Sequence, residues 1–409
     1  MLKVGPKSII AIAAVFTLCT CIDPYTPKLR GYDSLLVIDG LITDANTSYS
    51  VKLSRTFQVQ NSTPAMVSDA NVFITDNAGN NITLSSTGNG LYKTDSIDFT
   101  GSVGRTYSLH ITTKEGDEYI SDPSTMLSGP DIDSVYFAKD QELVNNGTQT
   151  QEGLSIYLDS KAGNNNQYYR WAYDETWKFK VPDPKKFNFN EADSLITSVA
   201  DIKEFCWKNH KSDNILIYSN NSGQPGIVKK QPVTFIPSDQ SDRLLVEYSV
   251  LIKQYSVSKT EYDFWDNLKS VNENGGDIFA SQPFSVISNI HNINNPKEQV
   301  LGYFQVSAVK QKRIFVPFSK IAEMNLPYYH YPCQRIEAKP GDYPSPWGPP
   351  ITWDYIYELF CVTSDYYFVE PEYLNGTNTL EKMVFARPEC ANCELTGTQT
   401  KPDFWVDLN

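Results

Sequence analysis

The sequence predicts a mainly β protein: an N-terminal β-sandwich of immunoglobulin or transthyretin type, followed by a larger β-rich domain with one or two short helices. Two observations support this fold class. The chain of 409 residues is rich in strand-forming aromatic residues, with 25 tyrosines and 20 phenylalanines. Short β-rich runs, separated by Gly, Asn and Asp, recur at spacings of roughly 8–12 residues. Such spacing is typical of sandwiches built from short strands.

Residues 1–20 are predicted to be a secretory signal. Lys3 and Lys7 precede an apolar run over residues 9–18, which is too short to span a bilayer as a stable helix. We expect cleavage before Cys21, because the Leu-Cys-Thr that precedes it resembles the box of bacterial lipoproteins. Cys19 is a competing lipidation site. An unprocessed anchor and a secreted chain without lipid are the alternatives.

Residues 21–33 are predicted to form a tether, because Pro24 and Pro27 keep this stretch extended. The β-sandwich domain is predicted over residues 34–126. Its clearest local signal is a hairpin whose turn, Asp76–Asn81, separates two β-rich runs. The predicted strands of this domain are 35–42, 49–57, 72–76, 81–86, 90–94, 106–113 and 119–123.

Residues 127–409 are predicted to form the second, β-rich domain, with an irregular polar stretch over 182–198. One helix is predicted near 259–274, because Ser258 and Glu261 fit a capping box and apolar residues follow at helical spacing. Its aromatic stripe is expected to pack on the sheet; a ligand platform is the alternative. The predicted strands are 131–137, 153–160, 168–181, 205–208, 214–220, 243–258 and a pair within 300–318.

The charge excludes nucleic acid as a partner. Loss of Lys3 and Lys7 with the signal leaves 33 basic and 48 acidic residues, a formal charge of −15. No pair of the four histidines has metal-binding spacing, and no GxSxG, GxxxxGK or GxGxxG motif is present. We therefore predict no enzyme, no metal and no cofactor. A hydrolase with two carboxylates from distant strands is the exception that sequence leaves open.

Five cysteines remain after lipidation of Cys21, and an exported chain favours disulfides over redox or metal roles. Two bridges and one spare thiol is the simplest expectation. We predict that Cys333 pairs with Cys361, and that a second bridge uses Cys390 or Cys393. The disulfide candidates are Cys206, Cys333, Cys361, Cys390 and Cys393.

The stretch 325–357 is dense in proline, tyrosine and tryptophan. Such rings offer flat apolar faces with a polar rim, which suits stacking on sugar rings or filling a partner's pocket. A loop that only caps a β domain is the alternative. The binding or interface candidates are Tyr328, Tyr329, Tyr331, Trp347 and Trp353.

An ordered set of short motifs runs along the chain: CIDPYTPKL, LLVIDGLITD, GRTYSLHI, PDIDSVYF, VLGYFQVS and the closing CANC and KPDFW. This set resembles the domain-of-unknown-function 4249 lipoproteins of Bacteroidota. The resemblance implies an exported lipoprotein with an N-terminal sandwich domain, encoded beside TonB-dependent outer-membrane receptors, and no catalytic residues. Cys333 and Cys361 look like additions to the usual pattern of that family.

These observations lead to one functional hypothesis and one main alternative. We expect a non-catalytic accessory subunit, anchored in the outer membrane through the lipid on Cys21, exposed at the cell surface, and bound to a β-barrel protein such as a TonB-dependent transporter. The periplasmic face is the other possible location. The alternative function is a surface lipoprotein that binds glycan or peptide.

Overall fold

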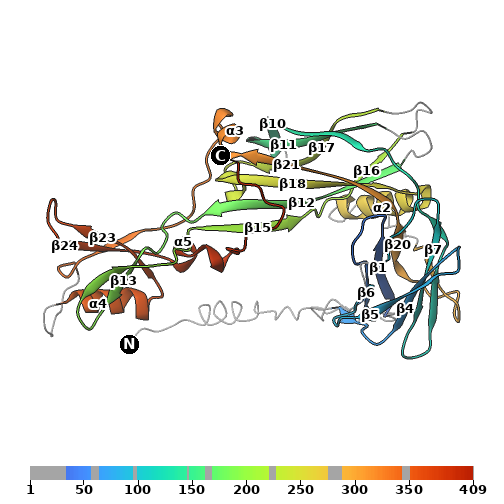
Figure 1. The fold of residues 1–409 in the computed structure, drawn as a ribbon, viewed down its shortest axis with the longest axis horizontal. Helices are drawn as coiled ribbons and strands as arrows, with labels where there is room; N and C mark the ends of the chain where they lie inside the picture. Colours follow the sequence, from blue (N-terminus) through green and yellow to red (C-terminus); the bar gives the residue numbers. More distant parts are fainter. Residues whose placement is uncertain are drawn as a thin grey trace, which may run out of the picture.

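The structure, a computed structural model, describes residues 34–56, 64–94, 99–144, 147–161, 168–220, 227–274, 288–342 and 351–408. These residues form five β-sheets with a few short helices, so the prediction of a mainly β fold is confirmed. The sheets group into three parts along the length of the molecule (Figure 1). We call these parts the N-terminal module, the middle sandwich and the distal lobe.

The N-terminal module is one sheet of 11 strands in the order β19-β8-β7-β4-β5-β6-β2-β1-β20, with β3 on β2 and β9 on β7. Its end strands meet, because the Asn289 side chain, just before β19, exchanges two hydrogen bonds with the Phe304 backbone on β20. The folded-over sheet encloses a core of aliphatic side chains and tyrosines. The strands are β1 (Leu36–Ile42), β2 (Ser50–Arg55), β3 (Ala65–Met66), β4 (Asn71–Asp76), β5 (Asn81–Ser86), β6 (Leu91–Thr94), β7 (Thr106–Thr112), β8 (Glu118–Ser121), β9 (Ser124–Thr125), β19 (Ile290–Asn292) and β20 (Leu301–Val306).

The sheet of this module extends beyond the boundary predicted at residue 126. Strand β20 lies parallel to β1, and β19 pairs with β8, although both come from the second half of the chain. Gly302 makes the close pairing possible: its φ is +90°, and a Cβ there would lie 1.8 Å from the Ile38 carbonyl oxygen. The predicted hairpin around Asp76–Asn81 is present as β4 and β5.

The middle sandwich packs a sheet of three strands, β10-β11-β17, against one of five, β15-β12-β18-β21 with β16 beside β12. Alternate residues of β12, from Tyr169 to Phe179, point into the shared core. The strands are β10 (Ile132–Val144), β11 (Gln149–Lys161), β12 (Tyr168–Lys180), β15 (Phe205–Lys211), β16 (Leu216–Ser219), β17 (Ile227–Pro237), β18 (Glu247–Ser256) and β21 (Ala308–Pro317), and the turn η1 (Asp242–Leu244) contacts β12.

Residues 300–318 hold two strands that do not pair with each other. β20 belongs to the N-terminal module and β21 to the middle sandwich, and the chain passes from one to the other at the fully buried Ser307. The expectation of a strand pair is therefore wrong. A strand pattern predicts the strands, but it does not identify their partners.

Helix α2 (Lys259–Asn274) matches the predicted helix and lies between the middle sandwich and the N-terminal module (Figure 1). Ser258 Oγ accepts from the Glu261 N–H at 3.1 Å, so half of the capping box forms. The Glu261 carboxylate is instead buried, where it accepts from Ser307 Oγ at 3.0 Å. Arg170 of β12 lies over the rings of Tyr255 and Trp265 and carries the opposing charge. This cluster joins the helix to both neighbouring parts.

The distal lobe holds the sheet β22-β24-β23 and the hairpin β13-β14. The hairpin falls within the stretch 182–198 that was predicted to be irregular, so that prediction is wrong. Three short helices complete the region. The elements are β13 (Phe187–Asn190), β14 (Leu195–Ser198), α3 (Phe318–Glu323) at the entry to the lobe, β22 (Ile336–Ala338), α4 (Trp353–Tyr357), the π-helical turn η2 (Glu358–Thr363), β23 (Tyr367–Tyr373), β24 (Leu380–Ala386), α5 (Pro388–Ala391) and the 3₁₀ turn η3 (Cys393–Leu395).

Candidate functional site

The segment Tyr328–Tyr331, which we call the aromatic ridge, follows α3 and leads from the middle sandwich to the distal lobe. Tyr328 is 56% exposed, and its ring contacts His330 edge to face at 5.5 Å between centroids. The rings of Tyr329 and Tyr331 meet in the same way at 5.1 Å. The ridge therefore presents aromatic surface to solvent from a backbone without regular secondary structure.

Tyr331 fixes the inner side of the ridge. Its hydroxyl donates to Asp242 Oδ2 at 3.1 Å, and that buried carboxylate also accepts from Trp177 Nε1 and Lys208 Nζ. Burial and the nearby Asp242 charge raise the pKa of Tyr331 well above its ordinary value. The phenol stays protonated and remains a donor, so it holds the ridge on η1 and β12.

Two disulfides hold the chain beyond the ridge. Cys333 bonds to Cys390 and Cys206 bonds to Cys393, so neighbouring residues of the CANC motif staple different segments. The predicted pairing of Cys333 with Cys361 is wrong; Cys361 is the free cysteine of the described chain. Burial raises the pKa of the Cys361 thiol to about 11, so it stays protonated at neutral pH.

Two hollows adjoin the ridge, and Tyr328 and Tyr329 line both of them. One, of about 450 Å³, combines the tyrosines with charged residues of the lobe entry, Lys180, Asp183 and Arg335. The other, of about 210 Å³, is largely apolar and includes Phe318, which is 48% exposed. The ridge tyrosines thus line both a charged hollow and an apolar one, an arrangement that suits a protein or peptide surface more than a small substrate.

The predicted platform residues do not all lie here. Tyr328, Tyr329 and Tyr331 lie together on the ridge, whereas Trp353 packs against the core of the distal lobe. The sequence between the ridge and α4 did not indicate that Trp353 lies apart from the ridge. Trp347 and the predicted lipidation residue Cys21 fall outside the described residues.

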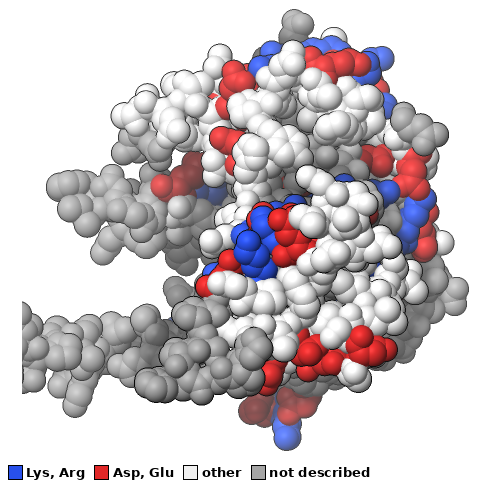
Figure 2. Space-filling model, turned by 90° about the vertical axis from the view of Figure 1, so that its left-hand side faces the viewer, with Lys and Arg blue, Asp and Glu red and all other residues white. Residues whose placement is uncertain are grey.

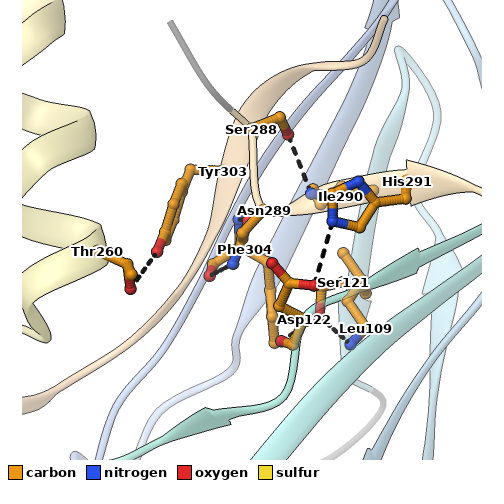
Figure 3. A network of polar contacts seen from close by, with 10 residues as sticks. All are labelled: Leu109, Ser121, Asp122, Thr260, Ser288, Asn289, Ile290, His291, Tyr303 and Phe304. Carbon is orange, nitrogen blue, oxygen red and sulfur yellow. Dashed lines mark hydrogen bonds and ion pairs between the residues drawn. The ribbon is translucent and has the colours of Figure 1, made fainter. Parts of the chain in front are cut away.

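A third hollow, of about 340 Å³, lies between α2 and the N-terminal module and was missed by sequence reasoning. In its lining the Tyr303 hydroxyl lies 3.3 Å from Thr260 Oγ1, and Asp122 contacts His291 at 3.1 Å (Figure 3). Its polar residues come from three distant segments, at 122–124, 260–267 and 288–289. No local motif could have shown this site. We call it the α2 hollow.

The described part of the chain contains no group of three or more His, Cys, Asp or Glu side chains placed to hold a metal ion. In the middle sandwich, buried Glu175 accepts from the Tyr248 hydroxyl at 2.6 Å and contacts His210 at 3.1 Å. Arg243 lies 3.6 Å from the same carboxylate. These contacts give the buried Glu175 carboxylate its partners, so we assign it a structural role in the core between the two sheets.

Comparison with known proteins places the chain in a family that is defined by sequence. The chain belongs to the family described as domain of unknown function DUF4249, whose family model matches residues 22–313. No curated protein matches. A solved structure titled "Biofilm associated protein - BSP domain" is similar at 7% identity, with 72% of this chain and 63% of that chain covered, but its TM-score of 0.13 carries no argument. This chain thus spans less than two thirds of that structure.

Proposed function

We propose that this protein is an exported accessory lipoprotein, anchored in the outer membrane through the lipid on Cys21, exposed at the cell surface, and docked on a β-barrel partner by its aromatic ridge. The observation that carries the proposal is the ridge itself. Tyr328 is exposed, Tyr329 and Tyr331 are half-buried beside it, and an apolar hollow adjoins them; tyrosines next to apolar pockets are among the residues that dominate binding energy at protein interfaces.

The N-terminal part of the chain supports the export half of the proposal. The family match begins at residue 22, directly after Cys21, and leaves out the basic and apolar segment that a signal peptidase would remove. The two disulfides fit an oxidising compartment. No described helix is both long and apolar enough to cross a bilayer. In the proposal, the lipid on Cys21 attaches the protein to the membrane.

The charge distribution supports docking to a protein. Figure 2 shows the distal-lobe end of the molecule, where most exposed atoms are uncharged and the charged side chains form small groups, several of mixed sign. The whole chain nevertheless carries a net charge of −13. An end face without a large field of one sign does not exclude an acidic partner by repulsion. The identity of the partner class, a TonB-dependent transporter or another outer-membrane β-barrel, follows from the resemblance of the chain to its family.

The experiment is a mild-detergent pull-down of the tagged native protein from outer membranes, with mass spectrometry of the co-purified proteins. We expect one β-barrel protein in stoichiometric amount, and we expect Tyr328→Ala to reduce its recovery. Tyr355→Ala, which removes a 48% exposed tyrosine from the distal lobe, is the matched control. Recovery of the lipoprotein alone, under conditions that preserve other outer-membrane complexes, would reject the accessory function.

Lipidation is tested separately. Metabolic labelling with a fatty acid should mark the wild-type protein and leave a Cys21→Ala variant unlabelled. Labelling of the Cys21→Ala variant would move the anchor to Cys19. Digestion of intact cells with a protease should remove the protein if it is exposed at the surface, and protection from the protease would place it on the periplasmic face.

The alternative function is a surface lipoprotein that binds glycan or peptide. Its glycan form is favoured by the α2 hollow, whose lining offers carboxylates, amides and hydroxyls.

A further inference from the structure

The α2 hollow is lined by hydrogen-bonding side chains around an apolar floor. Two aromatic residues, Phe264 of α2 and Tyr303 of β20, form the floor with ring centroids 4.7 Å apart. The polar lining provides carboxylates, amides and hydroxyls: Asp122, Ser124, Thr260, Asp263, Asn267, Ser288 and Asn289. Its volume of about 340 Å³ falls at the lower end of the range of small-molecule sites, roughly 300–1,000 Å³.

The site is held in place before any ligand arrives. Asn289 is 7% exposed and exchanges two hydrogen bonds with the Phe304 backbone, each 2.9 Å long. Ser288 Oγ accepts from the Ile290 N–H at 3.2 Å, and the Tyr303 hydroxyl reaches Thr260 (Figure 3). A preformed lining loses little conformational entropy on binding, so hydrogen bonds to a polar ligand contribute more of their free energy to the affinity.

The charges of the lining exclude an anionic ligand. The described residues that line the α2 hollow include Asp122 and Asp263 and, within the described part of the chain, no lysine or arginine. Both carboxylates already have partners: Lys259 Nζ lies 2.6 Å from Asp263 Oδ1, and His291 Nε2 lies 3.1 Å from Asp122 Oδ1. Each carboxylate keeps lone pairs that can accept from further donors. The charge of Asp263 is already balanced by Lys259, so this carboxylate does not require a cationic ligand. A neutral ligand with many hydroxyl donors satisfies this arrangement.

We propose that the α2 hollow is a binding site for a neutral saccharide, with Asp263, Asn267 and Asp122 hydrogen-bonding to sugar hydroxyls above the Phe264 and Tyr303 floor. The carboxylates accept from the hydroxyls, and the amide of Asn267 both donates and accepts. The site is independent of the aromatic ridge. It would let an accessory lipoprotein hold the glycan near the membrane whether or not a β-barrel partner is bound.

The test is calorimetric titration of the full-length protein in detergent with four neutral probes: maltohexaose, cellohexaose, xylohexaose and mannohexaose. We expect at least one to bind. Asp263→Asn should weaken that binding by about tenfold, because one hydrogen bond to a charged acceptor is replaced by a neutral one. Asn267→Trp, which places an indole in the hollow, should abolish it.

Two control variants separate this site from other surfaces. Asp266→Asn removes the same charge from an exposed position of α2 that does not line the hollow, and it should bind like the wild type. Tyr328→Ala should also bind saccharide normally, because the ridge is a different surface. A circular dichroism melt of each variant checks that the fold is retained.

Three outcomes overturn the proposal. The first is that none of the four probes binds. The second is that a probe binds, but Asp263→Asn and Asn267→Trp bind it with the wild-type affinity. The third is that spermidine, a cationic probe, binds in place of the saccharides and that the two variants no longer bind it. The last outcome would assign the hollow to amine ligands. Each of these results leaves the pull-down test of the ridge unaffected.

Discussion

The two disulfides make a quantitative prediction about stability. The bond between Cys206 and Cys393 closes a loop of 187 residues, and the bond between Cys333 and Cys390 closes one of 57. Loop-closure entropy gives about 5 kcal/mol for the first bond and about 4 kcal/mol for the second at 25 °C. The first value hardly changes when the second bond shortens its loop, because the entropy depends on the logarithm of loop length.

The perturbation is the double variant Cys206→Ala with Cys393→Ala. Both residues are completely buried, so the change removes the bridge without exposing a polar group. We expect the free energy of unfolding to fall by several kcal/mol, with about 5 kcal/mol as the upper bound. The C-terminal strand pairing of Thr398 with Trp207 lies just beyond the bond and should become sensitive to protease.

The assay is urea unfolding followed by tryptophan fluorescence, with and without reductant. Cys361→Ala is the matched control: it removes the free cysteine of the described chain, and it should shift the unfolding midpoint much less. Wild-type protein treated with reductant should behave like a variant that lacks both bridges. A double variant that unfolds at the wild-type urea concentration would contradict the stabilisation expected from loop closure, and peptide mapping that finds Cys333 bonded to Cys361 would contradict the disulfide pairing.

Three further predictions test the junctions and the ridge. Burial raises the pKa of Glu261 above its ordinary 4.5, so the folded state binds this proton more tightly than the unfolded state does. The free energy of unfolding should therefore fall as the pH rises from about 4.5 through the raised pKa. Urea unfolding at a series of pH values should show this slope in the wild type and lose it in Glu261→Gln. Gly302→Ala should lower the free energy of unfolding by well over about 1 kcal/mol, because the new Cβ would meet a carbonyl oxygen of β1. Gly79→Ala is the control: its φ is +87° but the space around it is open, so it should cost only about 1 kcal/mol of backbone strain. Thermal melts of the two variants measure the difference. Tyr331→Phe should cost about 1–3 kcal/mol, because the buried Asp242 loses a donor, and equal melting temperatures would contradict this.

Local sequence signals predicted local structure well. Helix α2 begins and ends where the capping residues and apolar spacing indicate, and the turn at Asp76–Asn81 forms the predicted hairpin. Both depend on residues within a few positions of one another. The β13-β14 hairpin was missed because both strands have only four residues: β13 alternates phenylalanine with asparagine, and β14 ends in threonine and serine, so the composition of the stretch is that of a loop.

Long-range structure could not be predicted in the same way. The apolar run at 301–306 identifies a strand, but nothing in it specifies a parallel partner at 37–42 in the N-terminal module. The disulfides show the same limit: Cys333 has Cys361 nearer in sequence, yet it bonds to Cys390, because α5 lies against the lobe entry. Pairing is decided by the packing of whole elements, which a spacing rule does not contain.

The two candidate binding sites lie where the three parts of the molecule meet. A short sequence motif therefore cannot contain the complete lining of either site. The aromatic ridge lies where the middle sandwich meets the distal lobe, and the α2 hollow lies where the helix meets the N-terminal module. At each place the lining comes from at least three segments that are distant in sequence. Because the sites share no lining residue, variants in one should leave binding at the other unchanged, and their effects should add. If both proposals hold, the double variant Tyr328→Ala with Asp263→Asn should lose recovery of the β-barrel partner to the same extent as Tyr328→Ala alone, and saccharide affinity to the same extent as Asp263→Asn alone.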